Sequence, residues 1–191
     1  MAGKLAYYNK MTKLVELIVF VDENGKPTGE TGPKLESHTA HTKRHLAFSC
    51  YIFRRSDQKF LMTQRALSKK VWPGVWTNSV CGHPAPGEAI EDAIRRRAQQ
   101  ELGITDLSDI SCLLPRYKYT TPPFNGIIEN EFCPVYMAYT TDEPQPNPDE
   151  VEAYEWLSWS EYAELLKSEP DKMSYWAKDQ YRQLKDLELF E

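Results

Sequence analysis

The hydrophobic pattern changes from a strand period to a helix period near the middle of the chain. In EAIEDAIRRRAQQEL, residues 88–102, apolar side chains recur every three or four positions, and Gly103 stands where a C-terminal helix cap belongs. A central helix is therefore predicted there. Alternating, β-branched and aromatic runs predict strands on both sides of it. The expected strands are 14–22, 46–53, 59–65 and 75–83 before the helix, and 113–121, 129–140 and 153–159 after it.

The remaining segments complete a single-domain pattern. Residues 23–34 are rich in turn formers, and Ser56 and Asp57 predict a hairpin. Two shorter amphipathic helices are expected near 160–168 and 174–187. Many strands around one helix, with a helical tail, predict an α/β or α+β fold in which helices flank a mixed sheet. With 191 residues, we expect an N-terminal extension at 1–10 and one compact domain at 11–191.

Composition narrows the possible partners. Lys and Arg number 23 against 28 Asp and Glu, a net charge of −5, which disfavours general nucleic-acid binding. No apolar run approaches the roughly 20 residues that a spanning helix needs, so no membrane partner is expected. The four cysteines form no C-x-x-C pair, and the N-terminus has no secretory core. A reduced, cytoplasmic protein is expected, with a monomer or a weak dimer left open.

Histidines and paired carboxylates suggest a metal site. Three of the four histidines lie within eight residues, and the fourth, His83, follows Cys81 by two. Glu129 and Glu131 share one face of a predicted strand, where two carboxylates inside a pocket are costly without a cation or a proton; the alternative is that this face is solvated. Three imidazoles and two carboxylates suit a six-coordinate divalent ion, whether Mn²⁺, Mg²⁺ or Zn²⁺, with one open position. The candidate ligands are His38, His45, His83, Glu129 and Glu131.

The segment that starts at Gly82 resembles the Nudix box, a signature of diphosphate chemistry. Arg97 and Gln100 stand where that box has glutamates, so two of the carboxylates that gather metal for hydrolysis are absent. The resemblance implies the Nudix fold and leaves a Nudix-type diphosphate hydrolase as an alternative function. A module with a structural zinc is a second alternative, disfavoured by the carboxylate-rich site. The positions that fit the box are Gly82, Glu88, Arg96, Glu101, Gly103 and Ile104.

Basic residues add a candidate anion site. Arg97 and Glu101 lie one helical turn apart on one face. A cation beside a magnesium-binding carboxylate suits a diphosphate, which needs both fixed positive charge and a metal bridge. The basic group comprises Lys34, Arg65, Lys69, Lys70, Arg95, Arg96 and Arg97.

Three segments together resemble the type I isopentenyl-diphosphate Δ-isomerases, a branch of the Nudix fold. They are ALSKKVWPGVWTNSVCGHP at 66–84, HTAHTKRHLAFS at 38–49 and GIIENEFCPV at 126–135. The resemblance implies interconversion of isopentenyl and dimethylallyl diphosphate, with Cys81 and Glu131 as the acid-base pair. It also implies that Tyr119 bonds the catalytic glutamate and that Trp176 lies over the reacting carbons.

The same resemblance implies how metal and substrate are held. The family's metal ligands fall on the five residues already assembled from the sequence, whereas His41 matches no ligand. The resemblance also implies a second ion, a Mg²⁺ held with the substrate diphosphate, whose ligands are Glu101 and the backbone carbonyl of Cys81. The residues implied to contact the prenyl diphosphate are Lys34, Arg65, Lys69 and Arg97.

Overall fold

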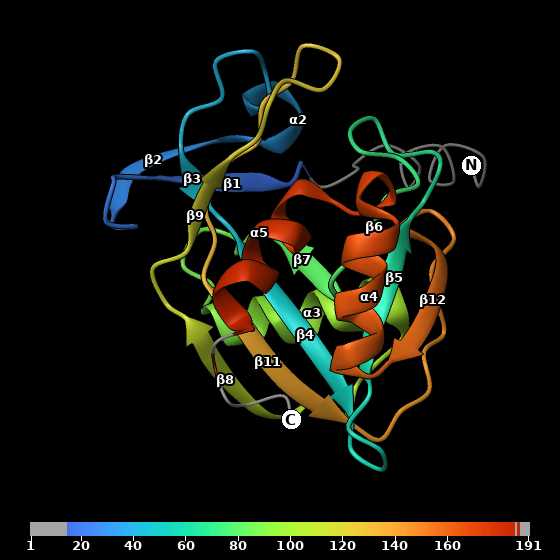
Figure 1. The fold of residues 1–191 in the computed structure, drawn as a ribbon. Helices are drawn as coiled ribbons and strands as arrows, with labels where there is room; N and C mark the ends of the chain where they lie inside the picture. The colour runs from blue at the N-terminus through green and yellow to red at the C-terminus, as the bar shows by residue number, and fades with distance from the viewer. Residues whose placement is uncertain (1–14, 186, 188–191) are drawn as a thin grey trace, which may run out of the picture.

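Two sheets carry the fold. The computed structural model describes residues 15–185 and residue 187. The smaller sheet has the strand order β2-β1-β3-β10-β9. Its strands β1, β2, β3 and β9 lie at the upper left of Figure 1. Its strands are β1 (Leu17–Val21), β2 (Pro27–Pro33), β3 (His45–Leu46), β9 (Lys118–Thr120) and β10 (Asn130–Phe132).

The larger sheet has the order β12-β5-β4-β11-β8, with β6 paired to β5 and β7 paired to β4. Strands β4 and β11 run parallel, whereas the other pairings of this sheet are antiparallel, which confirms the predicted mixed sheet. Its strands are β4 (Phe48–Arg54), β5 (Phe60–Arg65), β6 (Trp76–Thr77), β7 (Val80–Gly82), β8 (Ser108–Leu114), β11 (Val135–Thr140) and β12 (Val151–Leu157).

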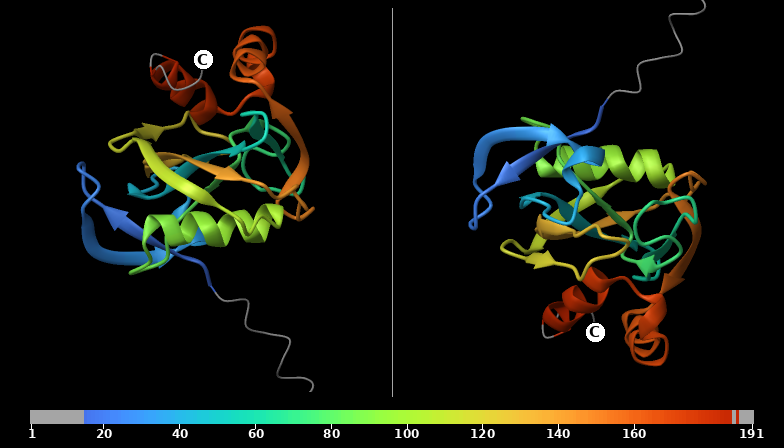
Figure 2. Two further views of the ribbon diagram at one scale, coloured as in Figure 1. Left: turned by 90° about the horizontal axis from the view of Figure 1, so that it is seen from below. Right: turned by 90° about the horizontal axis from the view of Figure 1, so that it is seen from above.

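Helices cover both faces of the larger sheet. Helix α3 (Ile90–Leu102) lies on one face, and α4 (Trp159–Ser168) and α5 (Tyr175–Leu184) lie on the other (Figure 2). Successive side chains of β4 point to opposite faces of the sheet. Ile52 packs in the hydrophobic cluster that includes α3, and Tyr51 packs in the cluster on the other face. The short α2 (Lys34–Ser37) and a 3₁₀ turn (Pro170–Lys172) complete the described helices.

Helix α3 matches the predicted central helix. Its apolar stripe, which includes Ile94, Ala98 and Leu102, is buried against the sheet. Gly103 ends the helix in the left-handed conformation, with φ of 67°, and its backbone N–H bonds carbonyls of the last turn.

Several strand boundaries differ from the expected ones. The turn-rich segment 23–34 is mostly β2, an edge strand held by its pairing with β1. The single strands expected at 75–83, 113–121 and 129–140 are each divided in two. The division at Cys133 and Pro134 lets the chain leave the small sheet as β10 and enter the large sheet as β11. The hairpin at Ser56 and Asp57 is confirmed between β4 and β5.

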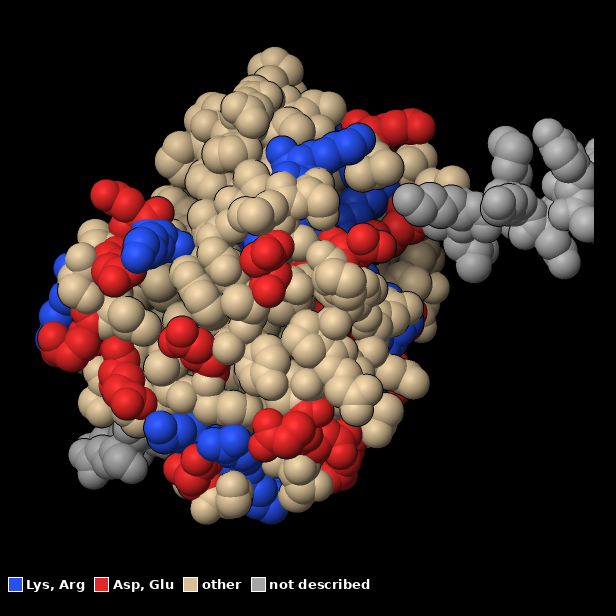
Figure 3. All heavy atoms as spheres, turned by 90° about the vertical axis from the view of Figure 1, so that its right-hand side faces the viewer, with Lys and Arg blue, Asp and Glu red and all other residues tan. Residues whose placement is uncertain are grey.

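Within the described residues, no helix is long and apolar enough to cross a membrane. Acidic and basic side chains are interspersed on the face shown in Figure 3, without one large field of a single sign. The extension expected at 1–10 lies outside the described residues.

Candidate active site

Strand register brings Tyr119, Glu131 and His45 side by side. Glu131 of β10 is paired with Tyr119 of β9 on one side and with His45 of β3 on the other. Residues paired directly across neighbouring strands point to the same face. The Tyr119 hydroxyl donates a hydrogen bond of 2.9 Å to Glu131 Oε2, and Glu131 is only 7% exposed. The small sheet therefore builds the centre of the site.

Two further histidines complete a cluster around Glu131 Oε1. His38 follows α2, and the turn after it allows His38 and His45 to meet, as their shared site requires. His83 follows β7, and its Nε2 lies 3.2 Å from both His45 Nε2 and Glu131 Oε1. One ligand atom from each of His38, His45, His83 and Glu131 lies within 4.8 Å of all the others.

Hydrogen bonds orient two of these rings. His38 Nδ1 lies 2.6 Å from the Lys34 carbonyl oxygen, and His45 Nδ1 lies 3.0 Å from that of Lys43. Donation from each Nδ1 leaves the Nε2 lone pair directed at the cluster, as metal ligation requires. His83 Nδ1 is buried without a hydrogen-bond partner among the described residues.

The donor set fits a divalent cation. Two ligands that are each about 2.1 Å from one ion at right angles lie about 3 Å apart, close to the 3.2 Å separations observed between His83 Nε2 and its two neighbours. Imidazole nitrogens with carboxylate oxygens suit several first-row divalent ions. This group could therefore hold a metal ion, whose identity the ligand types leave open.

Glu129 lies at the edge of this group. It directly precedes β10, and its Oε2 lies 3.2 Å from His38 Nε2. Its oxygen is not among the four tightly grouped ligand atoms, so its role as a fifth ligand stays a prediction. His41 is exposed and is not part of the group.

Burial and contacts between the side chains of the cluster have opposite effects on the pKa values of His38 and Glu131. Burial lowers the pKa of His83 to about 4. Burial would also lower the pKa of His38, but the hydrogen bond to Glu129 raises it above its ordinary value. For Glu131, burial would raise the pKa, and the contacts with His45 and His83 hold it well below 4.5. Glu131 is thus stabilised as a carboxylate by the surrounding imidazoles.

Cys81 lies on β7 of the larger sheet, paired with Ser49 of β4. Its thiol lies 3.4 Å from the Ser49 hydroxyl and donates to Asn78 Oδ1 at 3.1 Å. Burial raises the pKa of Cys81 to about 12, against the opposing effect of these hydrogen bonds. The group is therefore a thiol, and two polar contacts fix its position.

Asn78 connects Cys81 to the C-terminal helix. Its side-chain oxygen also accepts a hydrogen bond of 3.2 Å from Trp176 Nε1 on α5, while its amide donates to the carbonyls of Cys50 and Val80. The Trp176 ring lies 6.1 Å from that of Tyr119. The contacts thus run from Glu131 through Tyr119, Trp176 and Asn78 to Cys81.

Three of the predicted diphosphate contacts are paired with carboxylates. Lys34 pairs with Glu16, and Lys69 contacts Glu150. Arg97 contacts both Glu101 and Glu150.

Arg65 is held differently. Its guanidinium donates to the carbonyls of Val71 and Trp72 and lies 5.7 Å from the centre of the Trp176 ring. Its guanidinium therefore lies beside the aromatic residues of the site.

Gly82 makes room for Arg97 and so explains one position of the box. A Cβ at Gly82 would lie 2.9 Å from Arg97 Cγ and 3.2 Å from the Phe48 ring. Arg97 Nε donates to Glu101 Oε1 at 2.8 Å. Burial raises the pKa of Glu101, and the Arg97 charge opposes that rise. The glycine therefore allows this pair to lie directly beside the Cys81 strand.

Arg96 and Glu88 have a structural role. Arg96 donates two hydrogen bonds of 2.7 Å to the Glu88 carboxylate and a third, of 3.2 Å, to the His83 carbonyl. Together with the Glu88 bond to the Ala85 backbone, these contacts hold the loop between His83 and α3.

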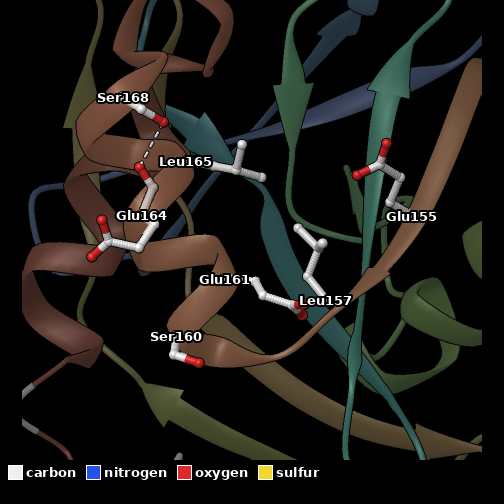
Figure 4. Close-up of a pocket in the computed structure, with 7 residues that line it drawn as sticks. All are labelled: Glu155, Leu157, Ser160, Glu161, Glu164, Leu165 and Ser168. Carbon is white, nitrogen blue, oxygen red and sulfur yellow. Dashed lines mark hydrogen bonds between the residues drawn. The ribbon is translucent and has the colours of Figure 1, made fainter.

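A separate groove lies between β12 and α4 (Figure 4). Its polar groups are mainly carboxylates and hydroxyls, and Glu161 there also closes the N-cap of α4 with Ser158. No imidazole or thiol is among the residues drawn, so the candidate chemistry belongs to the His and Cys cluster.

Two residues with contacts in this region were not predicted from the sequence. Asn78 stands inside the TNSVCGHP segment, where its spacing of three from Cys81 was the available signal. Glu150 lies in a turn before β12 and had no comparable signal, because its contacts depend on chain folding.

The comparisons identify the family. A family model described as the NUDIX domain matches residues 43–180. An isopentenyl-diphosphate Delta-isomerase of Kocuria rhizophila is 46% identical over 168 residues, which cover 88% of this chain and 92% of the relative. Its counterpart in Paenarthrobacter aurescens is 48% identical over 169 residues, with 88% and 90% covered.

Solved structures agree on the fold. A crystal structure of DR0079 from Deinococcus radiodurans matches with a TM-score of 0.66 at 21% identity, covering 88% of this chain and 98% of that one. The MutT protein from Methanosarcina mazei matches with a TM-score of 0.57 at 17% identity, covering 74% and 93%. With its relatives taken into account, the chain belongs to the isopentenyl-diphosphate Delta-isomerase family of enzymes and is built on the NUDIX domain.

Proposed function

We propose that this protein interconverts isopentenyl diphosphate and dimethylallyl diphosphate by two proton transfers, with Cys81 and Glu131 as the acid-base pair. The observation that carries this proposal is the continuous set of contacts between the two groups through Tyr119, Trp176 and Asn78. Moving a double bond requires one proton to be added and another removed, and each transfer needs a positioned acid or base.

The residues around the pair have distinct tasks in this proposal. Tyr119 orients the Glu131 carboxylate through its hydrogen bond. Trp176, 4% exposed, covers the reacting carbons and helps to exclude water that would capture a carbocation. An indole face stabilises a desolvated cation by about 2 kcal/mol. Asn78 keeps Trp176 and the Cys81 thiol in one arrangement.

We assign the metal to His38, His45, His83, Glu129 and Glu131, with Mn²⁺, Mg²⁺ and Zn²⁺ as the candidate ions. A divalent ion there would supply positive charge that fixes these ligands in the interior. The substrate diphosphate would be bound by Lys34, Arg65, Lys69 and Arg97. A Mg²⁺ that accompanies it would be held by Glu101 and the Cys81 carbonyl.

The alternative is diphosphate hydrolysis on the same fold. It is disfavoured because Arg97 pairs with Glu101 at a position where the box has another carboxylate. We also place the reaction in the cytoplasm, where a reducing environment keeps Cys81 available as a free thiol.

Incubation with isopentenyl diphosphate and Mg²⁺, followed by identification of the products, tests the proposal. Dimethylallyl diphosphate should form with the wild-type protein and fall by at least about 10³-fold with Cys81→Ala. Release of phosphate or diphosphate without dimethylallyl diphosphate would instead support the hydrolase alternative.

A further inference from the structure

Glu150 contacts two of the cations that the proposed function assigns to the substrate. Its Oε2 contacts Lys69 Nζ and lies 3.3 Å from Arg97 Nη2. Arg97 also donates to Glu101, so the four side chains form a row of two cations and two anions. Among the described ion pairs, Glu150 is the carboxylate that joins two of the four proposed diphosphate contacts.

The backbone holds Glu150 in this position. The Ala66 N–H donates to the Glu150 carbonyl at 3.0 Å, which fixes the residue beside the end of β5. The Glu150 N–H bonds the Asn147 carbonyl, and the Asn147 N–H bonds the Glu101 carbonyl at the end of α3. These backbone hydrogen bonds therefore fix the turn that places the Glu150 carboxylate beside Lys69 and Arg97.

The side chains in this row differ in their freedom to move. The Glu101 and Arg97 side chains are 12% and 13% exposed, whereas those of Glu150 and Lys69 are 24% and 25% exposed. Glu101 lies on a buried face of α3 and would need to leave the interior. Glu150 can rotate toward solvent, which makes it the partner that an incoming anion displaces most easily.

We propose that Glu150 is a displaceable counter-ion that competes with the substrate diphosphate for Lys69 and Arg97, and so limits how tightly substrate and product are held. This inference rests on the proposed function, because it takes Lys69 and Arg97 as diphosphate contacts. A diphosphate cannot accept the same N–H groups while Glu150 accepts them, and two anions at one place repel each other. Glu150 is thus a positioning residue that acts through the two cations.

Binding of inorganic pyrophosphate, measured by calorimetry in the presence of Mg²⁺, tests this inference. Glu150→Gln keeps the shape of the side chain and removes its charge. It should tighten pyrophosphate binding by about tenfold, the change that corresponds to about 1.4 kcal/mol. Glu143→Gln is the matched control, since Glu143 pairs with Arg54 and none of the proposed diphosphate contacts. That control removes the same charge and should leave the affinity unchanged.

Lys69→Gln distinguishes a failure of the proposed diphosphate site from a failure of the proposed role of Glu150. If this variant binds pyrophosphate as well as the wild type does, the proposed diphosphate site is wrong and the inference falls with it. If Lys69→Gln weakens binding but Glu150→Gln does not tighten it, the diphosphate site stands and the role of Glu150 is refuted.

Steady-state kinetics distinguish competition from a structural role. With isopentenyl diphosphate, Glu150→Gln should lower KM by about tenfold without raising kcat, because product is held more tightly as well. A rise in KM would show that Glu150 only supports the fold and would overturn the inference. Glu150→Asp, which withdraws the charge by one methylene, serves if the glutamine variant does not fold. It should give a smaller tightening in the same direction.

Discussion

Glu131 takes part in both halves of the site. One of its carboxylate oxygens faces the imidazoles, and the other accepts the Tyr119 hydrogen bond. The strand pairings set this division, because Glu131 stands between Tyr119 and His45 in register. Tyr119 can therefore orient the carboxylate from one side, while the other carboxylate oxygen faces the imidazoles.

The metal assignment predicts a specific loss of metal. Because His45 is fully buried and offers a candidate ligand atom to the cluster, His45→Ala should weaken binding of a divalent ion by more than about tenfold. Metal content after dialysis, measured by elemental analysis, checks this. His41→Ala is the control, since His41 is exposed and outside the cluster. Equal metal content in the two variants would refute the assignment.

Part of this residue pattern could be predicted from the sequence. The spacing of Glu129 and Glu131, together with the histidines, indicated the cluster, and His38, His45, His83 and Glu131 do meet. The contact of Asn78 with Trp176 could not be predicted, because 98 residues separate them and only the placement of α5 brings them together.

The loop between His83 and α3 is the element that joins the histidine and glutamate cluster to the central helix. Arg96 holds it through Glu88 and through the His83 carbonyl. Glu88 has a lowered pKa because of its hydrogen bonds with Arg96, against the smaller effect of burial. The ion pair therefore stabilises the folded state only while Glu88 is ionised.

This pair predicts a pH-dependent stability. Glu88→Gln should lower the free energy of unfolding by about 1 kcal/mol at pH 7, a value reduced for partial exposure. Because the folded pKa lies below the ordinary 4.5, the stabilisation is present above about pH 4.5 and disappears as the pH falls through the lowered value. Denaturant unfolding of both proteins at pH 7 and near pH 3 checks this. A difference that persists undiminished near pH 3 would contradict it.

The sequence pattern predicts the central helix well but does not predict several strand boundaries. The central helix could be predicted because its apolar stripe and Gly103 agree. The segment PTGETGP has the composition of a turn, yet it forms β2, since pairing with β1 at the sheet edge outweighs its low strand propensity. Likewise, hydrophobicity continues past Cys133, whereas the chain changes sheets there.

At the scale of the whole molecule, the chain has the NUDIX domain, but its Nudix box lacks two of the usual glutamates. Arg97 contacts Glu101, and Gln100 lies within 3.5 Å of both Arg96 and Arg97. Two carboxylates of the box are thus replaced by a cation and an amide. The cation is suited to holding a diphosphate, but it cannot bind the metal ions that would activate water to attack one.

Hydrolysis should therefore be negligible beside isomerisation. With nucleoside and prenyl diphosphates, phosphate release should stay well below about 1 s⁻¹, the low end of typical enzymatic rates. A colorimetric phosphate assay with Mg²⁺ checks this expectation. Steady release at or above that rate would restore the hydrolase alternative.

Isomerisation of isopentenyl diphosphate in D₂O tests the central claim most directly, because each turnover must exchange protons at the substrate carbons. Deuterium in the dimethylallyl product, followed by mass spectrometry, should appear with the wild-type protein. It should fall by at least about 10³-fold with Cys81→Ala and somewhat further with Glu131→Gln, which also removes a proposed metal ligand. Near-normal turnover and deuterium incorporation by a folded, metal-loaded Cys81→Ala protein would contradict the account.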